Sequence, residues 1–280
     1  MRDMNLYDQT AFKSSKIITT SYSTSFSLGI KTLAKKFHFP IYAIYGFVRY
    51  ADEIVDTFHN FDKRSLLDEF KADMYQAIQK GISMNPVLQS FQIVVNKYGI
   101  DHELIDAFLE SMEMDLTEKK YSAEDYKKYI FGSAEVVGLM CLKVFCEGDK
   151  RLYNELKGPA KSLGSAFQKV NFLRDLKADH EDLSRTYFPN TDLSCLDEDS
   201  KKSIIEDIEN DFSKSIKGIR ELPIEARFGV FMAYRYYHQL LKKLKRTPAL
   251  KLKSTRIRVP NYKKIELLTR SYVKYQLNLM

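Results

Sequence analysis

The chain has 280 residues, of which 44% are hydrophobic, and this is long enough to bury one sizeable core. Glycine (11) and proline (7) are scarce, which indicates few tight turns and long helices. The three cysteines, Cys141, Cys146 and Cys195, form neither a CxxC pair nor a metal-binding pattern with histidine. A disulfide-rich scaffold is therefore excluded, and a reducing cytoplasm is expected.

The net charge of +7 is unevenly distributed along the chain. Residues 242–280 carry twelve Lys or Arg against one acid, Glu266, so this tail carries +11 and the remainder (+7 less +11) carries −4. Such a tail predicts attraction to a polyanion, either a diphosphate, an anionic lipid surface or a nucleic acid. The alternative is a solvated helix face that only keeps the protein soluble.

No signal peptide or membrane span is expected from the sequence. Residues 1–20 have no apolar h-region, and the longest apolar stretches, 39–48 and 136–142, are far shorter than the roughly 20 residues of a spanning helix. We expect a cytoplasmic protein whose basic tail associates peripherally with the inner face of an anionic membrane. The sequence does not predict the oligomeric state.

Apolar residues recur at spacings of three and four through most of the chain, for example over 66–78 and 105–112, which predicts helices. No segment alternates as a strand does. Helix ends are expected at Gly81, Asn85-Pro86, 97–99 and Gly158-Pro159, and a loop over 190–200 precedes an acidic helix over 204–212. The prediction is an all-α protein of eight to ten helices in one bundle-like domain, 1–280.

A first polar stripe lies in the segment 43–56. Tyr45, Arg49, Asp52 and Asp56 are spaced by four, three and four, so they share one face of a helix whose other faces are apolar. Two carboxylates one turn apart are costly in such a place unless a cation pairs them. A hard divalent cation, Mg²⁺, fits oxygen ligands; the alternative is a salt-bridged surface face in which Arg49 pairs with Asp52.

A second polar stripe lies in the segment 163–182. Its members follow spacings of three, four, four and three and form one line of side-chain oxygens: Gln168, Asn171, Asp175, Asp179 and Asp182. The alternative is an ordinary amphipathic helix with an acidic polar face. If the two stripes face each other, two or three Mg²⁺ ions can bridge them to a diphosphate, with Arg49 and Arg174 holding phosphate oxygens.

Four segments together resemble one known family. Residues 22–26 (Y-S-T-S-F), 43–56, the L-G-x-x-x-Q…N-x-x-R-D-x-x-x-D signature over 163–179, and 185–189 (R-T-Y-F-P) are similar to the trans head-to-head prenyl synthases. These enzymes are the phytoene, squalene and dehydrosqualene synthases, and the chain looks most like a bacterial phytoene synthase. The resemblance implies an isoprenoid-synthase-type helical bundle with a central cavity. It also implies Mg²⁺ as cofactor, with Mn²⁺ as a substitute.

The resemblance further implies roles for individual residues. The implied metal ligands are Asp52, Asp56, Asn171, Asp175 and Asp179. The implied catalytic residues are Tyr45, Arg49, Gln168, Arg174, Tyr187 and Tyr237, with Tyr234 and Tyr236 as neighbouring alternatives to Tyr237. The implied diphosphate-binding residues are Ser23, Ser25, Arg49, Arg174 and Arg256, the last within the segment 256–260 (R-I-R-V-P), which resembles the family's late R-V-R-V segment. Glu53, one position off the first stripe, is a departure.

The implied reaction condenses two prenyl diphosphates head to head through a cyclopropyl intermediate. Two geranylgeranyl diphosphates giving phytoene are favoured over two farnesyl diphosphates giving squalene or dehydrosqualene. NADPH is expected only if squalene is the product, and no G-x-G motif is present. The small and apolar residues over 129–140 are expected to form a tunnel wall for prenyl chains. For Gly132 and Gly138 the alternative is a close contact between helices. One rival is a non-catalytic assembly factor with this fold, which would predict a broken acid stripe, whereas both stripes are intact here. The other is a nucleic-acid-binding protein that uses the basic tail, which would leave the paired carboxylates unexplained.

Overall fold

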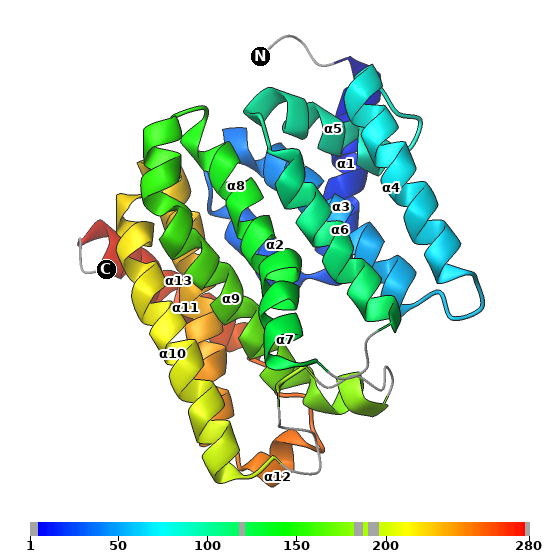
Figure 1. The fold of residues 1–280 in the computed structure, drawn as a ribbon. Coiled ribbons are helices and arrows are strands. Elements are labelled where there is room, and N and C mark those ends of the chain that lie inside the picture. The colour runs from blue at the N-terminus through cyan, green and yellow to red at the C-terminus, as the bar shows by residue number, and fades with distance from the viewer. Residues whose placement is uncertain (1–4, 118–120, 182–186, 190–195, 278–280) are drawn as a thin grey trace.

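The regular structure of the described chain is entirely helical (Figure 1). The computed structural model describes residues 5–117, 121–181, 187–189 and 196–277. The elements are α1 (Leu6–Tyr22), α2 (Thr24–Lys31), α3 (Lys35–Asp56), α4 (Lys63–Lys80), α5 (Pro86–Tyr98), α6 (His102–Thr117), α7 (Ala123–Ile130), the π-helical η1 (Phe131–Glu135), α8 (Val136–Cys146), α9 (Lys150–Glu181), α10 (Glu198–Glu221), α11 (Ile224–Arg246), α12 (Ala249–Leu252) and α13 (Asn261–Gln276). The predicted all-α class is confirmed.

The described residues contain more helices than the eight to ten predicted, because several are short. The helices α2 and α7 have 8 residues each and α12 has 4, too few for a pattern of three and four to repeat. Between α1 and α2 the chain breaks at Ser23, whose extended backbone ends one helix and whose side chain accepts from the Phe26 amide at 3.2 Å to begin the next.

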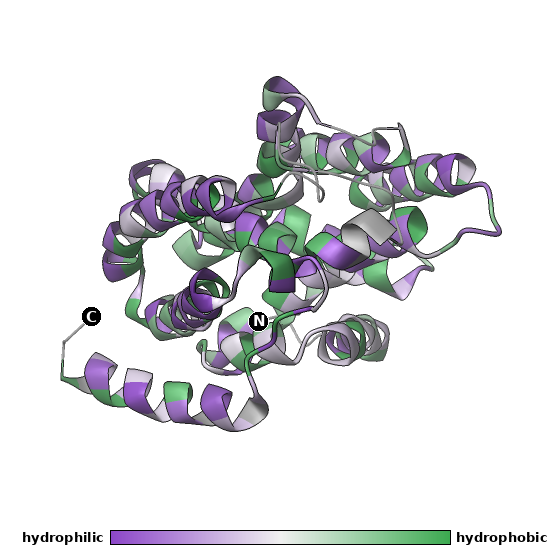
Figure 2. Cartoon of the chain, turned by 90° about the horizontal axis from the view of Figure 1, so that it is seen from below, coloured by the Kyte–Doolittle hydropathy of each residue, from purple (hydrophilic) through white to green (hydrophobic). Residues whose placement is uncertain are grey.

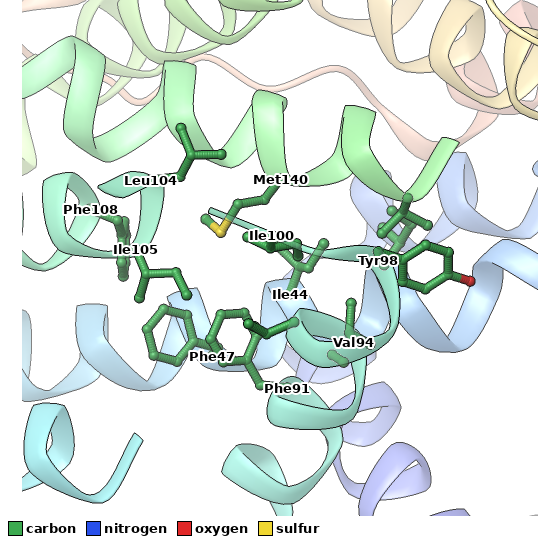
Figure 3. Close-up of a cluster of buried hydrophobic side chains, with 14 of the residues drawn as sticks. Ile44, Phe47, Phe91, Val94, Tyr98, Ile100, Leu104, Ile105, Phe108 and Met140 are labelled. Atoms are coloured by element: carbon green, nitrogen blue, oxygen red, sulfur yellow. The ribbon is translucent and has the colours of Figure 1, made fainter. Parts of the chain in front are cut away.

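Two hydrophobic clusters hold the helices together. The first joins α1 to α6 with α8 and with the starts of α9 and α11. The second joins α7, α10 and α12 with the remainder of α9 and α11 and with the segment before α13. In the first cluster Phe47 of α3 stacks on Phe91 of α5 with ring centroids 3.9 Å apart, beside Ile44 and Phe108 (Figure 3). Because Phe47 faces this core, the opposite face of α3 is turned away from it.

Most of the predicted helix ends are confirmed. Gly81 and Gly99 end α4 and α5 in the left-handed conformation, with φ of 69° and 58°, where a side chain would be strained. Asn85 caps α5, accepting from the Val87 amide at 3.0 Å, with Pro86 in the first turn. The acidic segment 204–212 lies within α10, as predicted. The loop expected over 190–200 is too long at its end, because α10 already begins at Glu198, capped by Asp197; residues 190–195 lie outside the described residues.

The predicted helix end at Gly158-Pro159 is wrong, because both residues lie inside α9, which is 32 residues long. Pro159 packs against α10 at Gly218, where an added Cβ would lie 2.2 Å from the proline Cβ. Packing along the length of α10 therefore outweighs the lost backbone hydrogen bond of the proline.

One stretch of the described chain, Ala123–Cys146, is long and apolar enough to cross a membrane by length and composition alone. The sequence predicts no membrane span. The stretch comprises α7, η1 and α8, and 56% of its most apolar window is buried inside the protein, as in a core helix.

The π-helical turn η1 lies between α6 and α9 at close range. A Cβ on Gly132 would lie 2.3 Å from the Ala107 carbonyl oxygen of α6, and one on Gly164 of α9 would lie 2.6 Å from the Ala134 carbonyl oxygen of η1. Of the two interpretations of Gly132, a tunnel wall or a close helix contact, the structure supports the close helix contact. The absence of a side chain at Gly132 and Gly164 therefore allows the backbones of α6, η1 and α9 to approach closely.

Replacing Gly132 by alanine is expected to destabilise the protein by about 1–3 kcal/mol, because backbone atoms of α6 and η1 must separate. Gly158→Ala is the matched control, since its Cβ would meet nothing within 4 Å and alanine favours a helix interior by roughly 0.5–1 kcal/mol. Urea unfolding followed by circular dichroism measures both. Equal midpoints for the two variants would contradict the close approach.

Candidate functional site

The first stripe lies on the face of α3 that is turned away from the core. Ile44, Phe47, Ala51 and Val55 are buried, whereas the four stripe residues Tyr45, Arg49, Asp52 and Asp56 are half-buried. The apolar spacing therefore positions the polar residues as predicted. Asp52 keeps 31% of its side chain exposed.

Tyr45 is held by the start of α2. Ser23 hydrogen-bonds the Tyr45 hydroxyl, and Phe26 stacks on its ring with centroids 4.8 Å apart. Burial raises the pKa of Tyr45 to about 12, so its hydroxyl stays protonated. The other predicted serine, Ser25, lies half-buried in the first turn of α2.

Arg49 is held on three sides and retains one unused donor. Its guanidinium bonds Glu53, lies 3.7 Å from an Asp52 oxygen and sits over the Tyr22 ring at 4.3 Å. Its Nε is buried without a hydrogen-bond partner. Glu53 therefore serves as a partner of Arg49, and the free Nε–H is suited to an anionic oxygen.

Asp52 experiences neighbouring negative charge that the protein only partly neutralises. Burial raises the pKa of the Asp52 carboxyl to about 8, and the Asp56 carboxylate adds to the shift while Arg49 opposes it. Asp115, on α6, also contributes. A bound cation would restore the ionised form, because it supplies the positive charge that desolvation and the neighbouring acids withhold.

The second stripe runs along α9 with its members on one face. Gln168 donates to the Ser133 hydroxyl of η1 at 3.3 Å and accepts from the Asn171 amide at 3.4 Å. The Asn171 Oδ1 is buried and has no hydrogen-bond partner. Asp179 lies on α9 beyond the part whose side chains are described, and Asp182 lies outside the described residues.

Two arginines converge on Asp175. Arg174 donates its Nε to an Asp175 oxygen at 2.9 Å, and Arg256, from the segment between α12 and α13, reaches the same oxygen at 2.7 Å. The Arg256 contact joins residues 81 positions apart and brings the predicted late segment to the second stripe. The paired Asp175 is thus enclosed by the cations assigned to diphosphate.

Tyr237 of α11 lies at the second stripe, within electrostatic range of Tyr45 on the first. It hydrogen-bonds with Asn171 and lies near Arg174. Phe167 stacks on its ring with centroids 4.0 Å apart. Its alternatives have other surroundings: Tyr234 packs on Phe212 and His238, and Tyr236 lies under Lys264.

Sequence reasoning missed Asp115 of α6, a buried carboxylate that contributes to the negative charge felt by Asp52. Its carboxylate accepts from the hydroxyls of Tyr129 at 2.7 Å, Tyr121 at 3.1 Å and Tyr187 at 3.3 Å. Tyr187 in turn stacks on Phe172 of α9 at 4.0 Å. A signal was available, because an acid three residues after Met112 continues the apolar stripe of α6, where an unpaired charge is costly.

The residues present fit a divalent cation. In the part of the chain that the structure describes, no three His, Cys, Asp or Glu side chains gather closely enough to hold a metal by themselves. The buried, unpaired Asn171 oxygen on α9 and the raised pKa of Asp52 on α3 nevertheless show that both helices carry an oxygen group without a full positive partner. Hard oxygen donors from two helices suit Mg²⁺, which commonly completes its shell with water and substrate phosphate.

The sequence of the chain also matches one protein family over most of its length. The family model "Squalene/phytoene synthase" matches residues 19–263, which include both stripes and Arg256. The chain belongs to the squalene/phytoene synthase family.

Among relatives, the chain is 26% identical to the phytoene synthase of Arthrospira platensis over 278 residues, covering 90% of this chain and 89% of that one. It is 25% identical to the chloroplastic phytoene synthase 1 of Zea mays, covering 81% of this chain and 60% of that one. This squalene/phytoene synthase family member thus spans about three fifths of the length of its maize relative.

Solved structures share the fold. A dehydrosqualene synthase superposes with a TM-score of 0.80 at 21% identity, covering 96% of this chain and 98% of that one. The squalene synthase HpnC of Alicyclobacillus acidocaldarius gives a TM-score of 0.75 at 18% identity, covering 87% and 96%. The predicted fold of the family is therefore confirmed.

Removing the Asp115 carboxylate is expected to lower stability by on the order of 3 kcal/mol, since hydrogen bonds to charged groups are worth about 1.5–3 kcal/mol each and three buried hydroxyls lose their acceptor. Asp115→Ala is compared with Asp73→Ala, an exposed aspartate of α4. Chemical denaturation reports the difference. Stability of Asp115→Ala within about 0.5 kcal/mol of the control would contradict the assigned role.

Proposed function

We propose that this chain is a Mg²⁺-dependent prenyltransferase that condenses two geranylgeranyl diphosphates head to head, releasing diphosphate and forming phytoene through a cyclopropyl diphosphate. Membership of the squalene/phytoene synthase family and relatives named phytoene synthase support this. The observation that carries it is a set of unsatisfied or anion-binding polar groups: the buried, unpaired Arg49 Nε–H and Asn171 Oδ1, and the two arginines, Arg174 and Arg256, that contact Asp175. An assembly factor would not require such a set.

The arginines bind the diphosphate groups in this proposal. Arg49 offers its unpaired Nε–H, whereas Arg174 and Arg256 are held by Asp175 until a phosphate competes for them. Ser23 and Ser25 lie at the opening turn of α2, beside Tyr45. Bidentate guanidinium contacts would orient the leaving group and keep it fixed as the C–O bond breaks.

Asp52 and Asp56 on α3 and Asn171, Asp175 and Asp179 on α9 would hold the metal. When bound, Mg²⁺, or Mn²⁺ in its place, neutralises and polarises the departing diphosphate. Gln168 orients Asn171 through their hydrogen bond.

The prenyl chains occupy the apolar surface between the helices. Phe26, Val48, Val137 and Phe167, from four different helices, stay half-exposed although they lie among buried residues. Cys141 of α8 is also half-exposed, and burial raises the pKa of its thiol to about 12. The rings of Tyr45, Tyr187 and Tyr237 would stabilise the allylic cation, and exclusion of water would protect it.

In this proposal some basic residues of the tail serve the site and others serve the protein surface. Arg256 contacts Asp175, whereas Lys245 pairs with Glu209 at 2.7 Å on the outside. We propose a cytoplasmic enzyme that associates with an anionic membrane through the surface group, since a long hydrocarbon product leaves water at a gain of about 0.8 kcal/mol per CH₂.

Purified protein incubated with geranylgeranyl diphosphate and Mg²⁺ should form phytoene, without NADPH and with full loss of turnover in excess EDTA. Parallel incubations with farnesyl diphosphate, with and without NADPH, identify a C30 enzyme instead. Turnover in EDTA would contradict the metal role, and no condensation of either substrate would contradict the proposed activity.

Asp52→Asn and Asp175→Asn should each abolish condensation while leaving the helical content unchanged, because an amide keeps the shape but not the ligand charge. The double variant should be little worse than either single one, since groups that act as a unit are not additive. Asp73→Asn on α4 is the control that keeps full turnover. Near-wild-type turnover of either site variant would remove its helix from the metal site.

A further inference from the structure

A strongly basic cavity opens between the end of α11 and the start of α13. It has a volume of about 390 Å³ and is lined by Gln239, Lys242, Lys243, Arg246, Val259, Pro260, Tyr262 and Lys263. Four of these eight residues are cationic, and none is acidic. The volume lies near the lower end of the roughly 300–1,000 Å³ typical of small-ligand pockets.

This cavity is separate from the site described above. At about 100° per residue, Gln239, Lys242, Lys243 and Arg246 lie roughly 140–240° around α11 from Tyr237. Tyr237 faces Asn171 and Arg174, so the cavity opens on the opposite, outer side of α11. Figure 2 shows α13, which forms the other wall, at the edge of the molecule.

The charges of the cavity are not neutralised by the protein within the described residues. Lys242, Arg246 and Lys263 are exposed and form no ion pair with another described residue, and Glu266, the acid on α13, pairs with Arg270 at 2.8 Å. Lys243 has a different task, because it donates to the Arg258 carbonyl at 2.7 Å and holds the segment that forms the cavity wall. Three cations thus converge on one space without a counter-charge.

A cluster of this kind has a preferred ligand chemistry. Like charges at short range repel, and a multivalent anion relieves that repulsion while accepting charge-assisted hydrogen bonds. Tyr262 and Gln239 add neutral donors at the rim. A single carboxylate would leave most of the positive charge unpaired, whereas a phosphate ester or diphosphate carries enough charge and oxygen atoms.

We propose that this cavity is a binding site for a phosphate-bearing anion, distinct from the substrate diphosphate sites, with Lys242, Arg246 and Lys263 as its cationic ligands. The ligand chemistry is met by free diphosphate or by the headgroup of an anionic phospholipid. The site depends on these side chains alone, so it does not rest on the proposed condensation activity.

The test compares two variants of equal net charge. The site variant carries Lys242→Gln, Arg246→Gln and Lys263→Gln; the control carries Lys13→Gln, Lys16→Gln and Lys202→Gln, three exposed lysines on α1 and α10. The full chain is titrated calorimetrically with inorganic diphosphate in EDTA, so that metal-dependent binding at the two stripes does not contribute. In parallel, it is sedimented with phosphatidylcholine vesicles with and without phosphatidic acid, at low and high salt.

Wild type and control should bind alike, and the site variant should bind on the order of tenfold more weakly or not at all. Binding of diphosphate alone identifies a soluble ligand, and binding of phosphatidic acid vesicles alone identifies a lipid headgroup. Equal loss in the control would attribute binding to net charge and overturn the proposal, as would the absence of binding to both probes. Circular dichroism of each variant verifies that it is folded.

Discussion

The half-buried Asp52 carboxylate on α3 is the constraint on which the rest of the site depends. Asp52 shares its helix face with Asp56 and lies near Asp115, and burial among these acids raises its pKa to about 8. One arginine, Arg49, compensates only in part. On α9, the Asn171 oxygen is likewise unpaired, and Asp175 is held by Arg174 and Arg256.

The fold positions these groups by close helix approach. Gly132 and Gly164 bring η1 to both α6 and α9, so that Ser133 can orient Gln168 and Asp115 can reach the tyrosines that pack on Phe172. On the other side, Phe47 anchors α3 in the first hydrophobic cluster with its polar face directed away. Membership of the squalene/phytoene synthase family is consistent with this shared design.

Periodicity was sufficient to predict the all-helical fold and the two polar stripes, because side chains at three and four residues apart share a face whatever the tertiary structure. It failed where tertiary packing decides, as at Pro159, which continues α9 because Gly218 of α10 leaves room for its ring. Asp115 was missed for the same reason: its three tyrosine partners come from three places in the chain. The basic tail was recognised as a whole, but its division into Arg256 at the site and a cavity on the outer side of α11 requires three-dimensional coordinates.

The most direct test of the convergence of the two stripes is a crystal structure with Mn²⁺ and inorganic diphosphate, in which anomalous scattering locates the metal. The account predicts Mn²⁺ between α3 and α9, with the diphosphate bridging it to the arginines and with oxygen ligands from Asp52 on one helix and from Asn171 or Asp175 on the other. Metal bound by one helix alone, or diphosphate found only in the cavity on the outer side of α11, would contradict it.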